Sequence, residues 1–431
     1  MWRLLYNLLL YAAAPVVWLR LAWRGVSHPE YADGWLERAG FIPRLPAKGP
    51  IWLHAVSAGE VMSASPLIAA LREALPGVPV VLTTTTPAGA ECAVRLFGSQ
   101  VVHFYAPYDF PGAVRRFLNR LAPRVTILLE RELWPNVIYQ CHRRGIPVVL
   151  ANARMTSRSE RRYRWIAPLT RGMLERVSLA GCQSREQGRA MVGLGLAPER
   201  LLVTGNLKFD VALEREARIK AREIRRRWGN DRLVMLAAST HQGEEELMLA
   251  AYGELKPRFP KLLLVLAPRH PERFSYVCDL VGERYGLASH RRGDRVDRDV
   301  DVVLVDAMGE LATLYGACDV AIVGGSFVPG IGGHNVIEPA QHGVPVITGP
   351  HYQNWEDVMR LFLEQRSMIV AQDPSSLRES LVELLSRSRE RHALGERGLR
   401  VTETNRGATR MLLERIEVMV GDRSRHSATL E

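Results

Sequence analysis

Cysteine is scarce in this sequence, and the five residues present are too scattered to form a framework. None belongs to a C-x-x-C pair, which argues against a disulfide-stapled fold or a zinc knuckle and is typical of a reducing compartment. A Walker A motif and the G-x-G-x-x-G fingerprint of dinucleotide-binding folds are also missing. Neither a P-loop enzyme nor a nucleotide-dependent oxidoreductase is therefore supported. Internal repeats and low-complexity tracts are absent too.

Acidic residues are outnumbered, with 46 Asp and Glu against 57 Lys and Arg, which gives a net charge of +11. The isoelectric point is near 9.7. Such a charge attracts anionic partners, and nucleic acid, acidic lipid and phosphorylated substrates are all consistent with it. The apolar content of 47% and charged content of 24% are those of a folded globular protein, and 431 residues predict two or three domains.

The first apolar segment is short for a membrane span. Leu4–Leu19 holds sixteen uncharged residues, whereas about 20 are needed to cross the hydrocarbon core. Counting on to Trp23 gives a borderline span that includes Arg20, and the arginines at its end predict a cytoplasmic side for the rest of the chain. We interpret residues 1–24 as a membrane anchor, either single-pass or lying in the interface. A buried first helix and a signal peptide are the alternatives.

Apolar strands alternate with helix-like segments after the anchor. One series runs from IWLHAVS to VSLAGCQ and a second from RLVMLAAS to SMIVA. Near-continuous apolar strands of this kind indicate parallel sheets covered on both faces. We therefore predict an α/β fold of two Rossmann-like, doubly wound domains facing a cleft, at residues 25–207 and 208–400, with a C-terminal helix and polar tail at 401–431. B-type glycosyltransferases (the GT-B fold) share this architecture with other proteins, so architecture alone names no chemistry.

The stretch HAVSAGE, residues 54–60, follows the first of these strands and leads into a helix. Ser57 and Glu60 have the S-x-x-E spacing of a capping box, in which both side chains bind free N–H groups at the helix start. Alternatively, Glu60 is a carboxylate at the carboxyl end of a strand, where α/β folds bind ligands. The dipole of the following helix favours the ionised form of this glutamate.

A glycine-rich stretch between Gly324 and Pro350, GGSFVPGIGGHNVIEPAQHGVPVITGP, links a strand to a short helix starting at Asn335. Its backbone N–H groups are predicted to converge on an anion, with Glu338 placed to accept hydrogen bonds from a ribose diol. A flexible surface loop is the alternative interpretation.

Other polar residues also follow predicted strands. Each is a candidate ligand contact, and each is alternatively a surface charge or a helix cap. They are Glu130 and Glu132 in LERELWPN, Lys208 in GNLKFD, Ser239 and Thr240 in AASTHQ, and Arg269 and His270 in APRHPERF. The segment NARMTSRSERRYRW adds Arg154, Ser157 and Arg158. Its run of arginines suits a phosphorylated lipid headgroup, a nucleic acid backbone or a solvated helix face.

Taken in order, these motifs resemble the 3-deoxy-D-manno-octulosonic acid (Kdo) transferases of Gram-negative envelope synthesis. The matching segments are IWLHAVSAGEV, LERELWPN, NARMTSRS, GNLKFD, APRHPERF, GGSFV, GGHNVIEPA and GVPVITGPH. The resemblance extends from about residue 2 to residue 400. One departure is visible, because the family usually has Pro-Leu where Val336 and Ile337 stand. That change keeps apolar packing and loses only a helix-start proline.

The resemblance implies a GT-B fold and inverting transfer of Kdo from CMP-Kdo to the lipid A precursor, lipid IVA, in inner-core lipopolysaccharide synthesis. It implies an enzyme at the cytoplasmic face of the inner membrane, in contact with anionic lipids, that needs no metal or other cofactor and binds no nucleic acid. The catalytic residues would be Glu60 as general base, with Glu130 and Glu132 on the acceptor side. The acceptor would be bound by Arg154, Ser157 and Arg158. The donor contacts would be Lys208, Ser239, Thr240, Arg269, His270, Gly333, Asn335 and Glu338.

Two other functions stay open on the residues alone. Another membrane-associated GT-B glycosyltransferase would use a UDP-sugar in place of CMP-Kdo. A non-enzymatic binder of anionic lipid or nucleic acid would explain the charge and the arginine-rich segment. That second alternative gives no role to Glu60 or to the glycine-rich stretch.

Overall fold

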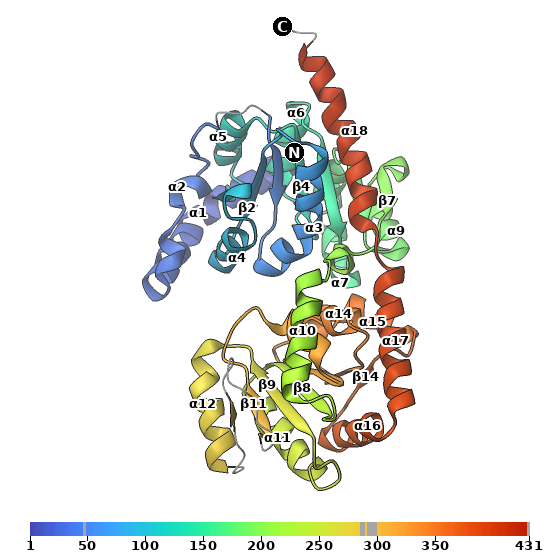
Figure 1. Ribbon diagram of the computed structural model, residues 1–431. Helices are drawn as coiled ribbons and strands as arrows, with labels where there is room; N and C mark the ends of the chain where they lie inside the picture. The colour runs from blue at the N-terminus through green and yellow to red at the C-terminus, as the bar shows by residue number, and fades with distance from the viewer. Residues whose placement is uncertain (46–48, 285–288, 291–299, 429–431) are drawn as a thin grey trace. The chain divides into compact units, whose positions relative to one another are not determined.

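Continuous apolar runs form the strands of two parallel sheets in the computed structural model, which describes residues 1–45, 49–284, 289–290 and 300–428. The chain divides into two compact units (Figure 1). The first unit comprises Met1–Val211 and Asn405–Glu431, and the second comprises Ala212–Thr404. The last helix therefore returns to the unit in which the chain begins.

The first unit is built on a seven-stranded parallel sheet with the order β3-β2-β1-β4-β5-β6-β7. Its strands are β1 (Ile51–His54), β2 (Val80–Thr84), β3 (Val102–Tyr105), β4 (Val125–Leu129), β5 (Val148–Ala153), β6 (Leu179–Cys182) and β7 (Leu201–Val203). Because the chain order reverses between β1 and β4, the carboxyl ends of these two strands form the topological switch point at which doubly wound folds bind ligands.

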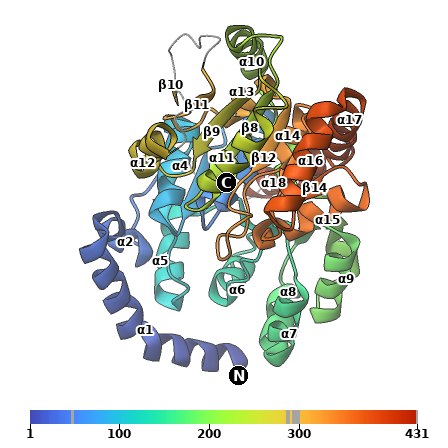
Figure 2. The same ribbon diagram turned by 90° about the horizontal axis from the view of Figure 1, so that it is seen from below.

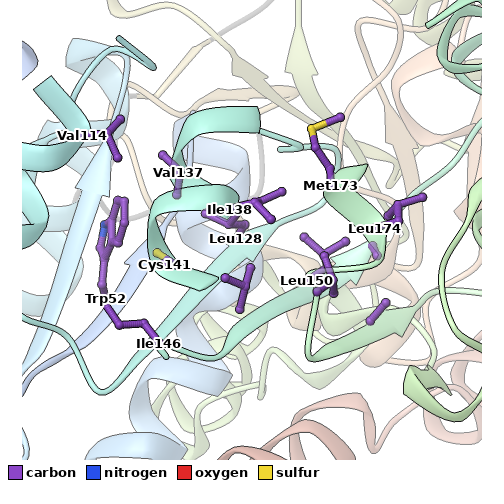
Figure 3. Close-up of a cluster of buried hydrophobic side chains, with 14 of the residues drawn as sticks. Trp52, Val114, Leu128, Val137, Ile138, Cys141, Ile146, Leu150, Met173 and Leu174 are labelled. Carbon is purple, nitrogen blue, oxygen red and sulfur yellow. The ribbon is translucent and has the colours of Figure 1, made fainter. Parts of the chain in front are cut away.

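Helices cover both faces of this sheet. They are α1 (Trp2–Ser27), α2 (Trp35–Arg38), α3 (Ala58–Ala74), α4 (Pro87–Phe97), α5 (Pro111–Leu121), α6 (Pro135–Arg143), α7 (Ser157–Trp165), α8 (Ala167–Leu174), α9 (Arg185–Leu194) and α18 (Ala408–Ala428). Alternate side chains of a strand point to opposite faces. Trp52 of β1 accordingly enters a core with α5, α6 and α8 (Figure 3), while Ile51 and Leu53 enter a second core with α3, α4 and α18.

The first core is organised around Trp52. Its ring packs on Phe117 of α5 with the ring centroids 4.8 Å apart. Its indole N–H donates to the Thr83 hydroxyl on the neighbouring strand at 2.9 Å. A buried indole needs such a partner for its one donor, so this bond allows the largest side chain of the sheet to lie in the core.

The last helix of the chain is held at its start by Asp210. This carboxylate accepts the N–H groups of Gly407 at 2.7 Å and Thr409 at 2.5 Å, which are otherwise unpaired at a helix start. From there α18 runs beside α3 (Figure 1), and its Leu412 and Ile416 are fully buried in the second core.

The second unit repeats the architecture, with the strand order β10-β11-β9-β8-β12-β13-β14. Its strands are β8 (Val234–Thr240), β9 (Leu263–Pro268), β10 (Ser289–His290), β11 (Val302–Leu304), β12 (Val320–Val323), β13 (Val346–Thr348) and β14 (Ile369–Val370). Its helices are α10 (Arg215–Trp228), α11 (Glu244–Leu255), α12 (Phe274–Asp279), α13 (Leu311–Leu314), α14 (Ile337–Gln341), α15 (Glu356–Glu364), α16 (Pro374–Ser386) and α17 (Ser388–Thr404). The switch point here lies between β8 and β12.

The predicted fold class is confirmed: two doubly wound parallel α/β units with an apolar N-terminal helix. One local expectation is wrong. The helix predicted to start at Asn335 begins at Ile337 and has only five residues. Asn335 instead stands before the helix and accepts the Ile337 N–H at 3.0 Å with its side-chain oxygen.

Candidate functional site

The predicted residues of the first unit gather at its switch point. Glu60 follows β1, Glu130 and Glu132 follow β4, and Arg154 follows β5, so three adjacent strands deliver them to one edge of the sheet. Lys208 reaches the same place from the turn after β7, where its ammonium lies 3.7 Å from a Glu130 carboxylate oxygen. The topology therefore brings together residues that are up to 148 positions apart (60 to 208).

Glu60 lies in the first turn of α3 and reaches back to the strand end. Its Oε2 accepts the Val56 N–H at 2.7 Å. Ser57 is the N-cap, but among the described residues its hydroxyl makes no capping hydrogen bond. The predicted capping box is therefore wrong in its Ser57 half, and the glutamate satisfies an N–H one residue earlier than expected. Beside it Gly59 is exposed, and a Cβ there would meet only the Ser57 hydroxyl, at 4.0 Å.

The surroundings of Glu60 favour its protonated form. The pKa of the Glu60 carboxyl is raised from 4.5 to about 8, chiefly by burial. The negative charges of Glu130 and Glu132 contribute to this rise, and the Val56 N–H opposes it. We expected the helix dipole to keep this group ionised. That expectation is wrong, because desolvation and two neighbouring carboxylates outweigh a dipole worth a few tenths to about 1 kcal/mol.

Glu130 occupies a strained backbone position. Its φ is 52°, in the left-handed region that residues other than glycine seldom adopt. The strain is held by two backbone bonds: its N–H donates to Ala151 at 3.0 Å and its carbonyl accepts the Arg154 N–H at 3.1 Å. Strained residues that the fold holds in place concentrate at functional sites. The conformation orients the Glu130 carboxylate toward Lys208.

Glu132 is fixed by aromatic neighbours. The indole N–H of Trp134 donates to its carboxylate, and burial raises the pKa of the Glu132 carboxyl. Trp134 in turn packs edge-on against His54, with centroids 5.1 Å apart. His54 is buried, bonds Thr83 through Nδ1, and leaves Nε2 without a hydrogen bond to any described residue. The pKa of His54 is lowered by burial to about 4, so the ring is neutral. His54 could not be recognised as a site residue from the sequence, because it lies within a predicted buried strand.

The predicted acceptor residues differ in exposure. Arg154 is half-buried at the end of β5, whereas Ser157 and Arg158 are exposed in the first turn of α7. All nine residues of α7 are at least partly exposed, so this stretch has the solvated helix face that was one of the interpretations left open.

Asn152 and Asp210 frame Lys208, and sequence analysis assigned neither a role. Asn152 adopts φ 54° in β5 and accepts the Leu207 N–H at 3.1 Å through its side chain. Asp210 binds the start of α18 as described above. The segment GNLKFD is therefore pinned on both sides of its lysine.

In the second unit, the glycine-rich loop binds a carboxylate of the protein itself. Glu244, at the start of α11, is fully buried. It accepts the N–H groups of Gly325 at 2.7 Å, Ser326 at 3.1 Å and Phe327 at 2.9 Å, together with that of His241 at 2.9 Å. The prediction that these loop N–H groups converge on a ligand anion is wrong for residues 325–327, because Glu244 already occupies that position.

Gly324 is required by the same arrangement. A Cβ at this position would lie 2.7 Å from a Glu244 carboxylate oxygen and 2.7 Å from the Ser239 carbonyl oxygen. Both distances are shorter than van der Waals contact, so any side chain would separate the loop from the carboxylate that holds it.

Strand β8 ends in a β-bulge at Ser239 and Thr240. Ser239 has φ 55°, and the register between β8 and β9 shifts around it. The Thr240 hydroxyl is buried and donates to Glu245 at 2.9 Å, and Glu245 is paired with Arg273 at 2.7 Å. The Thr240 side chain thus already has a protein partner.

The remaining predicted donor residues follow β9 and β12, the two strands that flank β8 in the sheet. Asn335 donates its amide to Glu338 at 2.8 Å, and burial raises the pKa of Glu338. Arg269 and His270 are exposed after β9. Gly333, whose φ is 81°, donates its N–H to the Gly325 carbonyl at 2.8 Å and so folds the second half of the glycine-rich loop onto the first.

Three histidines connect the ends of β8, β9 and β12. His241 stacks on His334 with centroids 5.1 Å apart and Nε2 atoms 2.8 Å apart, while His270 packs edge-on against His241 at 5.2 Å. Burial lowers the pKa of both His241 and His334. Within the described ranges, no group of three His, Cys, Asp or Glu side chains is placed to hold a metal ion.

Replacing Glu60 with Gln should stabilise the first unit at high pH. Below about pH 4.5 the carboxyl is protonated in both the folded and the unfolded chain, whereas between 4.5 and 8 only the folded chain keeps the proton, so wild-type stability falls as pH rises. Gln removes this cost and still accepts the Val56 N–H. We expect a Tm about 2–4 °C above wild type at pH 8 and no difference near pH 4. Glu73→Gln, exposed on the same helix, is the control. A Tm difference between Glu60→Gln and wild type that does not change with pH would contradict the raised pKa of Glu60.

Replacing Glu244 with Gln should destabilise the second unit. Four N–H donors face this carboxylate, and an amide presents one acceptor and an extra donor to them. The expected cost is about 2–4 kcal/mol in the free energy of unfolding, measured by urea denaturation. Glu254→Gln on the same helix, an exposed partner of Arg378, should change it by less than about 0.5 kcal/mol. Equal effects of the two variants would contradict the role given to Glu244.

Comparison with known proteins identifies a family for this chain. A family model described as 3-Deoxy-D-manno-octulosonic-acid transferase (kdotransferase) matches residues 33–211. A 3-deoxy-D-manno-octulosonic acid transferase from Haemophilus influenzae is 38% identical over 418 residues, covering 96% of this chain and 98% of that protein. One from Bordetella pertussis is 37% identical over 439 residues, covering 98% of this chain and all of that protein.

Among solved structures, the UDP-GlcNAc 2-epimerase of Neisseria meningitidis bound to UDP-GlcNAc superimposes with a TM-score of 0.59 over 85% of this chain and 98% of that chain. At 12% identity this likeness supports the fold alone. The relatives that match over the full length are glycosyltransferases, which favours the enzyme over the non-enzymatic lipid binder. The chain belongs to the 3-deoxy-D-manno-octulosonic acid transferase family.

Proposed function

We propose that this Kdo transferase moves Kdo from CMP-Kdo to the lipid A precursor, lipid IVA, with inversion at the anomeric carbon of the sugar. The family membership supports Kdo transfer in lipopolysaccharide synthesis. The observation that carries the chemistry is the Glu60 carboxyl at the switch point of the first unit, with its pKa near 8.

Glu60 is proposed as the general base. Its carboxylate takes the proton of the acceptor hydroxyl, the freed oxygen forms a bond to the anomeric carbon, and the bond from that carbon to the CMP phosphate oxygen breaks with its electron pair leaving on CMP. A base works best when its pKa lies near the working pH, so burial and two adjacent carboxylates suit Glu60 to this step better than an unperturbed glutamate. Glu130 and Glu132 are proposed to orient the acceptor and to maintain the high pKa of Glu60.

The acceptor carries phosphate groups, and the proposed contacts are basic. Arg154 lies half-buried beside the carboxylates, and Arg158 and Ser157 stand exposed at the start of α7. A guanidinium binds phosphate oxygens in a bidentate manner, which makes arginine suited to this role. Lys208 is proposed to contact the donor, in exchange for its ion pair with Glu130.

The donor is assigned to the switch point of the second unit. Glu338 and Asn335 form a hydrogen-bonded pair that suits a ribose diol, and exposed Arg269 and His270 suit the phosphate or the sugar carboxylate. Ser239, Thr240 and Gly333 are proposed to shape the backbone around the nucleotide. No metal or other cofactor is expected, because arginine and lysine supply the positive charge that stabilises the departing CMP.

The apolar helix α1 fits association with a membrane. We place the enzyme at the cytoplasmic face of the inner membrane, in contact with anionic lipids, because Arg20 and Arg24 follow the apolar segment.

The transfer itself is tested with the detergent-solubilised full chain. CMP-Kdo generated in situ and tetra-acylated lipid A precursor are supplied, and the lipid product is followed by mass spectrometry. We expect a mass increase of one or more Kdo units from the wild type and from Glu73→Gln, and a loss of about 10²-fold or more for Glu60→Gln. No product from folded protein that binds CMP would overturn the acceptor assignment. Product with a UDP-sugar instead would overturn the donor assignment.

The pH dependence tests the base. Because the pKa of Glu60 is raised to about 8, the carboxyl is protonated at lower pH and cannot accept a proton. The kcat/KM for transfer should therefore rise about tenfold per pH unit below 8 and level off above it. The residual activity of Glu60→Gln should lack this dependence. A profile already flat at pH 6 would show that another group is the base.

A further inference from the structure

The first half of α1 is fastened to the first unit by polar contacts. The Tyr6 hydroxyl donates to Asp109 at 3.0 Å, and the Asn136 amide donates to the Asn7 side-chain oxygen at 2.7 Å. The Arg3 guanidinium lies 3.3 Å from the centroid of the Tyr139 ring. A helix free to cross a bilayer makes no such contacts along its side.

The carboxylate under α1 is itself structural. Asp109 is 7% exposed and accepts the N–H groups of Asn136 at 3.0 Å and Val137 at 2.9 Å, at the start of α6. The hydroxyl of Tyr6 adds a third hydrogen bond to this carboxylate. Pulling α1 away would remove that bond from a buried carboxyl group, which is costly.

The second half of α1 is docked by aromatic rings. Trp18 packs against Trp35 at 5.5 Å and against Tyr108 at 5.4 Å between ring centroids, and Leu21 is 5% exposed. The contacts from Arg3 to Leu21 span 19 residues, or about 27 Å of helix. Figure 2 shows α1 bending as it follows the unit from α2 toward α8, which it contacts, and the helix contains Pro15. An interior proline kinks a helix.

The opposite side of α1, here called its outer face, is apolar and open. It consists of Leu4, Leu5, Leu8, Leu9, Val16, Leu19 and Trp23. Each of these side chains is between 46% and 71% exposed. The helix has three arginines and no acidic residue. Leu36 and Phe41, on and just after α2, extend the exposed apolar surface.

We propose that α1 lies in the plane of the membrane interface, with its docked face on the first unit and its outer face among lipid acyl chains. By length and composition α1 could cross a membrane. Crossing, however, would separate Tyr6 from Asp109 and place Asn7 in hydrocarbon without its partner. A helix with one apolar side and arginines but no acids is the type that lies in an anionic lipid surface.

A pocket at the N-terminal end of α1 also suits a membrane lipid. It has a volume of about 270 Å³ and lies between α1, α6 and α8. Apolar walls from Pro135, Leu169 and Met173 stand next to the guanidinium groups of Arg3 and Arg176. An anionic lipid offers both an acyl chain and a phosphate for such a lining.

The decisive experiment reads the location of the N-terminus and does not depend on the transfer reaction. Protease-cleavable epitopes are placed before Met1 and after Glu431, and protease is added to intact spheroplasts and to inside-out inner-membrane vesicles. An in-plane helix keeps both ends of the chain on one side of the membrane, which in the function proposed above is the cytoplasmic side. Both epitopes should therefore be protected in spheroplasts and cleaved in inside-out vesicles. Cleavage of the N-terminal epitope in spheroplasts would overturn the proposal and establish a span.

Vesicle binding tests the outer face as the contact surface. The full chain should sediment with vesicles of 30% phosphatidylglycerol in phosphatidylcholine, and Leu5→Gln/Leu8→Gln/Leu9→Gln should lower the partition coefficient about tenfold or more. Val94→Gln/Leu96→Gln removes two exposed apolar side chains of α4 and should leave the coefficient unchanged. Circular dichroism melting establishes that each variant is folded. Equal partitioning of the two folded variants would overturn the proposal.

Discussion

Carboxylates bound to backbone N–H groups hold the loops on which this enzyme's candidate site residues stand. In the first unit Asp109 binds the start of α6 and Asp210 binds the start of α18. In the second unit Glu244 collects four N–H groups around the glycine-rich loop. Because charge-assisted hydrogen bonds are stronger than neutral ones, these bonds fix the loops before any ligand arrives. A site that is ordered in advance needs little rearrangement when charge develops in it.

The general fold could be predicted from sequence because its cause is local. Parallel strands buried on both faces are continuous apolar runs, and residues that follow such runs must lie at the carboxyl edge of a sheet. That reasoning placed Glu60, Glu130 and Arg154 correctly at strand ends. The partner of the glycine-rich loop could not be found this way. Glu244 precedes Gly325 by 81 residues, and no spacing rule connects an acidic helix start to a loop that far along the chain.

The protonation state of Glu60 also could not be predicted from the sequence near it. Its helix start was visible in the sequence, and a helix start favours an anion. Its protonation is decided chiefly by burial, which is a tertiary property, and the two carboxylates that add to the effect, Glu130 and Glu132, come from the end of a different strand, 70 and 72 residues further on. Their charges and the burial of the site act in the opposite direction to the dipole. The sign of a pKa shift therefore depends on tertiary contacts, and a local motif predicts only one of its contributions.

Helix α1 and the candidate acceptor side are connected through one chain of contacts. Tyr6 of α1 binds Asp109, and Asp109 binds the N–H groups that begin α6. The residue directly before α6 is Trp134, which donates to Glu132. Whatever holds α1 against the first unit therefore also holds the loop that carries a proposed acceptor-side carboxylate. An acceptor lipid lies in a membrane, so an enzyme gains from fixing its reactive edge and its membrane contact within the same rigid unit. By length and composition α1 suits membrane association, and its polar contacts with Asp109 and Asn136 fix which of its sides is left to make it.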